Sequence, residues 1–204
     1  MSLHQRVFQE YERLCAARNI RGSVLEVGAI PYDGSLLTMR ALSGATEKVG
    51  INLDGPHTYR DFTILEGNGN DMACFEDGRF DAVLCNAVFE HDKFFWKTLA
   101  EIKRVTKPGG LILIGTPGYK KYPVEGIKSV LKKLPGIREL RRVPYLDLFF
   151  ASTITFQVHE GPGDYYRFTS DTFRDVFFEG MEDIETVTIM LPPRIVGVGV
   201  KPLG

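Results

Sequence analysis

The fold is decided by the stretch Ser23-Val24-Leu25-Glu26-Val27-Gly28-Ala29-Ile30-Pro31-Tyr32-Asp33-Gly34-Ser35. Its first half, residues 24–27, is a short and nearly continuous apolar run, which is typical of a parallel strand buried on both faces. A glycine ends that run, and a turn follows. After the turn an apolar stripe at helical spacing predicts a helix, formed by Leu36, Leu37 and Leu42. The stretch therefore predicts the strand, turn and helix that open an α/β sheet.

The turn after this strand is also a candidate ligand site. In open α/β sheets ligands lie at the carboxyl ends of the strands, and a glycine such as Gly28 lets the backbone approach them closely. The spacing G-x-G-x-x-G of a dinucleotide loop is absent, because Ile30 and Tyr32 stand where further glycines are expected. By itself, this turn is only a weak indication of a site.

The chain length, the net charge and the cysteine spacing limit the class of protein. The 204 residues suffice for one α/β domain and are too few for two, so we expect a single domain over 1–204. A net charge of −1 gives no overall attraction for nucleic acid. The three cysteines show no C-x-x-C spacing, which favours reduced thiols in a cytoplasmic protein without a metal site. No apolar run approaches the length needed to span a membrane.

The rest of the chain continues the α/β pattern. An amphipathic helix opens it, with Val7, Tyr11, Leu14 and Cys15 on one face. Further strands are expected at 48–52, 62–66, 80–85 and 111–115. The crossover at 53–61 is too short for a helix and should be mostly irregular. A helix with Phe95, Leu99, Ile102 and Val105 on its buried face should end at Pro108-Gly109-Gly110.

Polar residues follow two of these strands. Asn52 ends the second strand, where ribose hydroxyls are bound in nucleotide-type folds, and Asp54 can assist it. Asp71 and Met72 follow the third strand, and such a pair can hold an adenine, with the carboxylate on the amine and the thioether on the ring. The alternative is a solvated turn that Met72 anchors to the core.

Six motifs occur in an order that resembles a known family. They are Leu-Glu-Val-Gly at 25–28, Val-Gly-Ile-Asn at 49–52, Gly-Asn-Gly-Asn-Asp-Met at 67–72, Phe-Asp-Ala-Val at 80–83, Phe-Glu-His at 89–91 and Arg-Val-Thr-Lys-Pro-Gly-Gly at 104–110. Together they resemble the class I S-adenosylmethionine-dependent methyltransferases, in particular the small bacterial type 11 group. The resemblance implies a Rossmann-like, mostly parallel sheet of seven strands, with helices on both faces and an antiparallel C-terminal strand.

The resemblance also implies where S-adenosyl-L-methionine is bound. The first turn would hold its methionine end, the end of the second strand its ribose, the loop after the third strand its adenine, and the end of the fourth strand the methyl-donor pocket. In this order, the residues are Glu26, Gly28, Ala29 and Ile30; Asn52 and Leu53; Asp71 and Met72; and Asn86 and Ala87. Two departures from the family pattern are Asn52 in place of a carboxylate and the missing later glycines of the first turn.

Other functions remain open at this point. A nicotinamide cofactor needs several glycines around its pyrophosphate, whereas S-adenosylmethionine has no phosphate, so the first turn favours the methyl donor. The alternatives are a non-catalytic S-adenosylmethionine-binding protein of the same fold and an NAD(P)-dependent oxidoreductase. For a methyltransferase we expect transfer to the oxygen or nitrogen of a small-molecule or saccharide-like acceptor, in a monomer or homodimer.

Residues 118–169 leave the common core and should form a substrate-selecting insertion. Between 120 and 142 the chain has eight basic and two acidic residues, a net charge of +6 (8 − 2). An apolar stripe of Val124, Ile127, Leu131 and Leu134 predicts an amphipathic helix that ends at Pro135-Gly136. This basic helix would contact an anionic membrane surface or an acidic substrate, or it is a lid whose lysines are solvated.

Near the end of the insertion, residues 159–169 form a candidate acceptor site. They resemble a segment of methyltransferases encoded with bacterial cell-surface polysaccharide genes, with Asp164, Tyr165 and Arg167 facing the acceptor. His159 is the first candidate for a general base, and His91 the second. In the alternative structural role, Asp164 and Arg167 pair to brace the loop, and Thr169 or Ser170 caps the next helix. That helix carries Phe173, Val176 and Phe177, and strands at 185–190 and 195–200 close the sheet.

Overall fold

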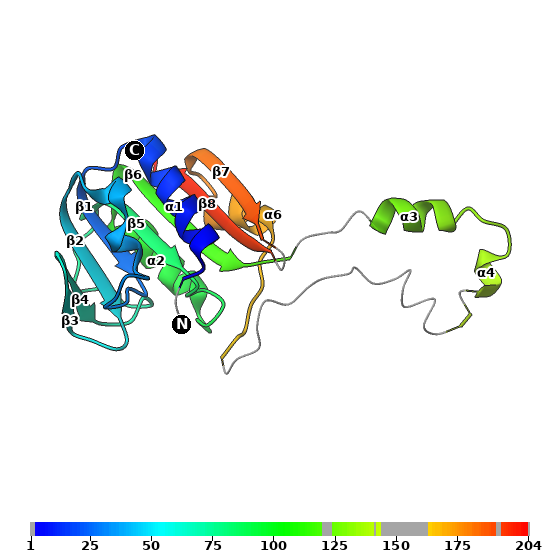
Figure 1. Ribbon diagram of the computed structural model, residues 1–204, viewed down its shortest axis with the longest axis horizontal. Helices are drawn as coiled ribbons and strands as arrows, with labels where there is room; N and C mark the ends of the chain where they lie inside the picture. Colours follow the sequence, from blue (N-terminus) through cyan, green and yellow to red (C-terminus); the bar gives the residue numbers. More distant parts are fainter. Residues whose placement is uncertain (1–2, 120–123, 141, 144–162, 191–192, 204) are drawn as a thin grey trace.

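The protein forms one large sheet in a computed structural model that describes residues 3–119, 124–140, 142–143, 163–190 and 193–203. The sheet has the strand order β3-β4-β2-β1-β5-β6-β8-β7 (Figure 1). Its strands are β1 (Gly22–Val27), β2 (Ala45–Asn52), β3 (His57–Tyr59), β4 (Phe62–Glu66), β5 (Phe80–Asn86), β6 (Thr106–Pro117), β7 (Glu182–Ile189) and β8 (Arg194–Val200).

The expected architecture is confirmed, with one strand more than expected. From β4 to β6 the neighbouring strands are parallel, and β8 is antiparallel to both β6 and β7. The sheet of the described residues has eight strands, so the expected number of seven is wrong. The additional strand, β3, lies in the crossover expected to be irregular and pairs antiparallel with β4. Arg60, between β3 and β4, has a φ of 50°, which allows the chain to reverse there.

The first crossover contains no α-helix, contrary to the sequence prediction. Two short 3₁₀ helices replace it, η1 (Leu36–Thr38) and η2 (Arg40–Leu42). Met39 lies between them in an extended conformation, with φ −61° and ψ 139°, and this interrupts helical hydrogen bonding. The predicted apolar stripe is nevertheless buried, since Leu36, Leu37 and Leu42 have no exposed surface. Burial was thus predicted correctly and the helix type was not.

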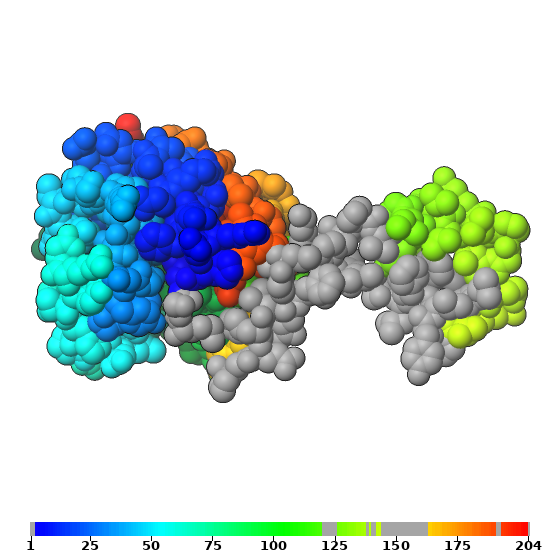
Figure 2. All heavy atoms as spheres, viewed as in Figure 1, coloured from blue at the N-terminus to red at the C-terminus, as the bar shows by residue number. Residues whose placement is uncertain are grey.

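Two helices cover opposite faces of the sheet. The helix α1 (Gln5–Arg18) packs with Tyr11, Leu14 and other residues on one core cluster. The helix α2 (Phe95–Val105) packs with Leu99, Ile102 and Val105 on the other. In Figure 1 α1 crosses in front of the sheet, and in Figure 2 its blue atoms cover the middle of that face. The expected helices on both faces are therefore present.

The end of α2 differs from the prediction. The helix ends at Val105, and β6 begins at Thr106, so residues 108–110 lie within a strand and do not end the helix. Thr106 takes an extended conformation, and its Oγ1 donates a hydrogen bond of 2.6 Å to the Ile102 carbonyl. This bond occupies a carbonyl at the helix end and allows the chain to leave directly into the sheet.

The segment before β7 is helical but short. It consists of α6 (Ser170–Thr172) and a π-helical turn, η3 (Phe173–Phe177). Thr169 caps α6 through a reciprocal pair of hydrogen bonds with Thr172, as one of the two predicted caps. Phe173 and Phe177 are buried, whereas Val176, also expected in the core, has 47% of its surface exposed.

Two helices of the insertion lie within the described residues. They are α3 (Val124–Leu131) and α4 (Ile137–Leu140), so the predicted basic helix ends at Leu131, before Pro135. Ile127 of the predicted stripe is exposed, while Lys128 is buried. The predicted separation of apolar and basic faces is therefore incomplete on this helix. None of the helices in the described ranges combines the length and hydropathy needed to cross a bilayer.

Phe177 provides a test of this packing. Its ring lies 4.9 to 5.1 Å from the rings of Phe173, Phe168 and Phe89. We expect Phe177→Ala to lower the free energy of unfolding in urea by about 3–5 kcal/mol, because it leaves a cavity in the core. The neighbouring exposed residue supplies the control, and Val176→Ala should change stability by no more than about 0.5 kcal/mol. Equal effects of the two substitutions would contradict the assigned burial.

Candidate cofactor and acceptor site

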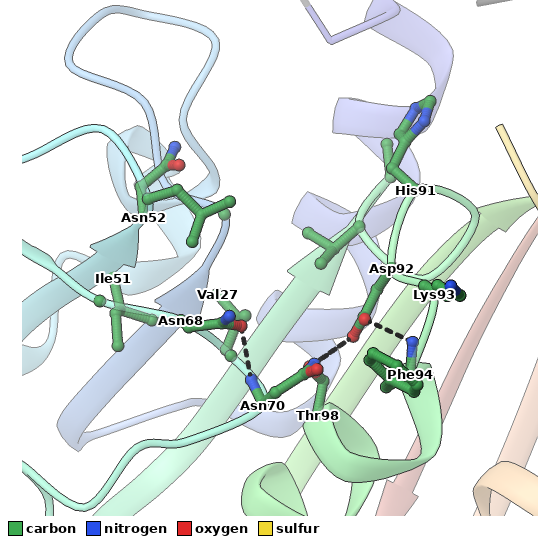
Figure 3. Close-up of a pocket in the computed structure, with 16 residues that line it drawn as sticks. Val27, Ile51, Asn52, Asn68, Asn70, His91, Asp92, Lys93, Phe94 and Thr98 are labelled. Carbon is green, nitrogen blue, oxygen red and sulfur yellow. Dashed lines mark hydrogen bonds between the residues drawn. The ribbon is translucent and has the colours of Figure 1, made fainter. Parts of the chain in front are cut away.

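A pocket of about 420 Å³ lies at the carboxyl ends of β1, β2, β4 and β5 (Figure 3). This is the edge of an α/β sheet at which ligands are expected. Its lining follows the strand ends: Gly28 after β1, Asn52 and Leu53 after β2, residues 67–70 after β4, and Ala87, Val88 and residues 91–94 after β5. The volume is within the range of small-molecule sites, about 300–1,000 Å³.

Gly28 lines the pocket in a conformation that few other residues tolerate. Its φ is 82°, and a Cβ at this position would lie 2.5 Å from Cγ2 of Val88. Its N–H donates a hydrogen bond of 2.8 Å to the Ile51 carbonyl, and the N–H of Ala29 donates to the same oxygen at 3.3 Å. Both amides are therefore occupied within the protein, and neither is available to bind a phosphate.

Glu26 braces the first turn from inside the fold and does not line the pocket. It is 4% exposed, and its carboxylate accepts hydrogen bonds from Ser35 Oγ, from the Leu36 N–H at 3.1 Å and from the Leu37 N–H at 3.3 Å. Burial raises the pKa of Glu26 to about 7, against the opposing effect of these three donors. Ala29 is fully buried against β2, and Ile30 is half-buried outside the pocket lining.

A hydrogen bond accounts for the asparagine at position 52, where the family pattern has a carboxylate. The Nδ2 of Asn52 donates a hydrogen bond of 2.7 Å to the Ala29 carbonyl and so ties the first turn to the end of β2. A carboxylate has no proton to donate there and would face the carbonyl oxygen unfavourably. Next to it, Leu53 lines the pocket with 72% of its surface exposed, which leaves an apolar face open to a ligand.

Asp71 and Met72, predicted to hold adenine, do not line the pocket. Met72 is fully buried in the core, and the Asp71 carboxylate accepts a bond from the Ala73 N–H at 3.3 Å. The structure thus matches the alternative in which Met72 anchors the turn. Residues 67–70 line the pocket in their place. The two glycines of this loop, at positions 67 and 69, were the sequence signal for this close backbone approach, since a Cβ at Gly69 would lie 2.9 Å from Thr98 Oγ1.

Asp92 is a site residue that sequence reasoning missed. Its Oδ2 accepts hydrogen bonds from Asn70 Nδ2 at 2.6 Å and from Thr98 Oγ1 at 2.7 Å, and its Oδ1 accepts one from the Phe94 N–H at 2.8 Å. Figure 3 shows the bonds from Asn70 and Phe94 converging on this carboxylate. They connect the loop after β4 to the start of α2. An aspartate just before a helix is a recognisable capping signal, and it was the available clue.

At the end of β5 the two predicted residues have different roles. Ala87 lines the pocket with a φ of 55°, held by a hydrogen bond of 2.9 Å from its N–H to the Gly115 carbonyl. This left-handed conformation is unusual for a residue with a Cβ, and such strain is often found at functional sites. Asn86 does not line the pocket and faces β6, since its Oδ1 would lie 2.6 Å from a Cβ at Gly115.

The predicted acceptor loop lies against the same rim. His91 lines the pocket, and its Nδ1 is 3.3 Å from the carbonyl oxygen of Gly163. The N–H of Tyr165 donates to the Glu90 carbonyl at 2.7 Å, and the Tyr166 hydroxyl donates to the Lys93 carbonyl at 3.0 Å. Residues 163–168 are therefore docked beside the pocket.

The three predicted acceptor residues are not equivalent. Arg167 donates two hydrogen bonds to the carboxylate of Asp164, and both side chains are almost fully buried, as the bracing alternative expected. Tyr165 is 55% exposed and is open to an acceptor. His159 lies outside the described residues, as do residues 120–123 of the basic segment. The described residues contain no cluster of three or more side chains suited to a metal ion.

Part of the chain matches a known domain family. Residues 37–114 match the methyltransferase domain family. None of the curated protein sequences matches this one.

Solved structures share the fold. A chain of the Haloferax volcanii complex between the Trm112 methyltransferase activator and a putative methyltransferase is 18% identical, with 97% of this chain and 92% of that chain covered and a TM-score of 0.60. A SAM-dependent methyltransferase from Archaeoglobus fulgidus is 12% identical over 97% and 94%, with a TM-score of 0.63.

A third structure contains a product of the cofactor. The Burkholderia thailandensis 1,6-didemethyltoxoflavin-N1-methyltransferase, with bound S-adenosylhomocysteine, is 13% identical over 96% of this chain and 78% of that chain, with a TM-score of 0.62. At these identities the structures show the fold, and the domain match adds a similarity in sequence over residues 37–114. The motif order, the sheet order and the domain match over residues 37–114 all agree with the fold of the class I S-adenosylmethionine-dependent methyltransferases.

Proposed function

We propose that the protein transfers the methyl group of S-adenosylmethionine to an oxygen or nitrogen atom of a small-molecule or saccharide-like acceptor. The observation that carries this proposal is a single pocket whose lining includes both cofactor-side and acceptor-side residues. Asn52 and His91 lie on opposite sides of this pocket in Figure 3, and residues 163–168 adjoin the His91 side.

The residues present fit the cofactor. The polar amide of Asn52 suits the ribose hydroxyls, and the exposed Leu53 suits the apolar face of adenine. Asn68 and Asn70 replace the predicted Asp71 and Met72 as the polar groups of the adenine end. When bound, S-adenosylmethionine supplies the electrophilic methyl group, and the protein contributes mainly proximity and orientation, which can supply about 7–11 kcal/mol.

A hydroxyl acceptor must also lose a proton. His91 is well placed to accept it, because a tautomer with the proton on Nδ1 donates to the Gly163 carbonyl and leaves Nε2 as an acceptor. Imidazole is the side chain most often used for this role. His159 remains the other candidate, four residues before Gly163 in the sequence. His57 on β3 offers a matched control, since it does not line the pocket.

The alternatives differ in what the pocket binds. An NAD(P)-dependent oxidoreductase needs backbone amides for a pyrophosphate, and the amides of Gly28 and Ala29 are occupied by the Ile51 carbonyl. A non-catalytic protein of this fold would bind S-adenosylmethionine and lack an acceptor. Membrane contact through 120–142, a homodimer and a cytoplasmic location remain predictions from the sequence.

Binding and turnover tests separate these functions. Calorimetry should detect S-adenosylmethionine and S-adenosylhomocysteine and should detect neither NAD nor NADP. Binding of the dinucleotides alone would favour the oxidoreductase. A screen of hydroxylated and aminated acceptors, including saccharides, scored by S-adenosylhomocysteine formation, then distinguishes an enzyme from a non-catalytic binding protein.

Two glycine variants test the first turn. Gly28→Ala and Gly180→Ala both place a Cβ on a residue with positive φ, at 82° and 74°, but only at Gly28 does that Cβ meet a neighbour within 4 Å. The positive φ should lower the stability of both variants by about 1–2 kcal/mol, and the contact with Val88 should add to the loss in Gly28→Ala. We expect only Gly28→Ala to weaken S-adenosylhomocysteine binding, by tenfold or more. Unchanged binding in Gly28→Ala would remove this turn from the cofactor site.

Histidine variants test the proton acceptor once the screen has supplied a hydroxyl acceptor. We expect His91→Asn to lower the turnover rate by about 10²–10⁴, the usual contribution of general base catalysis. S-adenosylhomocysteine affinity should stay within about threefold of the unmodified protein, and His57→Asn should leave both quantities unchanged. If His159→Ala shows the loss and His91→Asn does not, the role belongs to His159.

A further inference from the structure

Glu90 is a buried acid that the proposed mechanism does not use. Its side chain has no exposed surface, and within the described chain neither carboxylate oxygen accepts a hydrogen bond. Arg194 on β8 faces it, but Nη1 of Arg194 lies 3.7 Å from Oε1 of Glu90, beyond hydrogen-bonding distance. A buried carboxylate without hydrogen bonds is costly, so the position of Glu90 calls for a physical explanation.

Glu90 belongs to a group of buried charges, which we call the Glu90 cluster: Glu90, Asp164, Arg167 and Arg194. Asp164 and Arg167 form their own ion pair within it, and Arg194 faces Glu90. With Glu90 ionised the cluster has no net charge, and with Glu90 neutral its net charge is +1. Two further buried groups, Tyr11 of α1 and Cys85 of β5, lie within the field of Glu90, and burial raises the pKa of each, so both stay neutral.

The backbone of Glu90 holds the acceptor loop. Its carbonyl accepts hydrogen bonds from the N–H groups of Tyr165 at 2.7 Å and Tyr166 at 3.3 Å. Its neighbours Val88 and His91 both line the pocket. The same residue thus connects the pocket rim, the loop at 163–168 and the ion pair within that loop.

We propose that Glu90 is a positioning residue for methyl transfer: its buried carboxyl group, facing Arg194 and the Asp164–Arg167 pair, couples proton uptake to the docking of residues 163–168 beside the pocket. This inference rests on the proposed function, because it assigns the loop to the acceptor side of that site. When the loop is docked, Glu90 is buried. When the loop opens, water reaches the carboxyl group and favours its ionised form.

The sign of the pH effect follows from burial. Burial raises the pKa of Glu90 from 4.5 to about 7, with its own backbone N–H, Arg194 and Arg167 opposing the shift and Asp164 adding to it. Between these pH values the docked loop binds more protons than the open loop. Docking is therefore most favourable below about pH 4.5 and weakens as the pH rises to about 7. His91 keeps its bond to the Gly163 carbonyl when it is protonated, because Nδ1 then also carries a proton.

Hydrogen exchange measured by mass spectrometry tests the coupling without any acceptor. Protection of peptides that span 163–168 is measured from pH 5 to pH 8 and corrected for the intrinsic exchange rates. We expect protection in the unmodified protein to fall by roughly tenfold to a hundredfold. Glu90→Gln should remove most of this fall, because glutamine does not titrate. Glu47→Gln, in a surface ion pair with Arg79, should leave it unchanged.

Three outcomes would overturn the proposal. The first is protection of 163–168 that does not change with pH in the unmodified protein. The others are a Glu90→Gln variant that shows the full decrease in protection and a Glu47→Gln variant that loses it. If Glu90→Gln does not fold, Arg194→Met provides the test, because removal of this cation should move the fall to higher pH, and an unshifted profile contradicts the coupling. Calorimetry with S-adenosylhomocysteine on the same proteins judges the proposed function separately, and Glu90→Gln should bind it within about threefold of the unmodified protein.

Discussion

The structure depends on the buried carboxylate of Glu26 and the three donors that it accepts. Ser35 and the amides of Leu36 and Leu37 gather around this one group at the carboxyl end of β1. Without it, the buried N–H of Leu36 would lose its side-chain acceptor, at a cost of about 1–3 kcal/mol, and the N–H of Leu37 would keep only its bond to Ser35 Oγ. The bonds fix both ends of the first turn, and Gly28 enters the pocket between them. Glu26, which the resemblance assigned to the cofactor site, thus stabilises the turn that lines the pocket.

Much of the fold could be predicted, because buried parallel strands leave a plain signal in the sequence. Residues 24–27, apart from Glu26, and residues 111–115 are apolar runs, and both lie in the sheet. The helix type and the short strands could not be predicted in the same way. Leu36, Leu37 and Leu42 fit a helix and pack equally well as 3₁₀ turns, since burial alone does not specify helix type. The strand β3 has only three residues and escapes any periodicity argument.

On the cofactor side, the strand ends implied by the resemblance agree with the pocket better than the individual residues do. The pocket lies at the ends of β1, β2, β4 and β5, where the resemblance implied a cofactor site, but at three of these ends the implied residues include a neighbour of one that lines the pocket: Ala29, Asp71 and Asn86. Met72 is apolar and therefore went into the core, while Asn68 and Asn70 remained at the surface of the pocket. On the acceptor side, the motif offered both a binding and a bracing role for Asp164 and Arg167. The two residues pair within their own loop, three positions apart, and their burial is the feature that sequence spacing does not reveal.

The two edges of the sheet limit how this protein can associate. At one edge, β3 offers only three residues for pairing. At the other, β7 is acidic, its register is interrupted between Glu182 and Glu185, and Asp183 has a φ of 47° there. Short, charged or bulged edge strands resist the addition of a strand from another chain. Arg13 and Arg18 of α1 also bind the acids of β7 and hold that edge against the domain. Both edges of the sheet therefore disfavour the addition of a strand from a second copy of the chain.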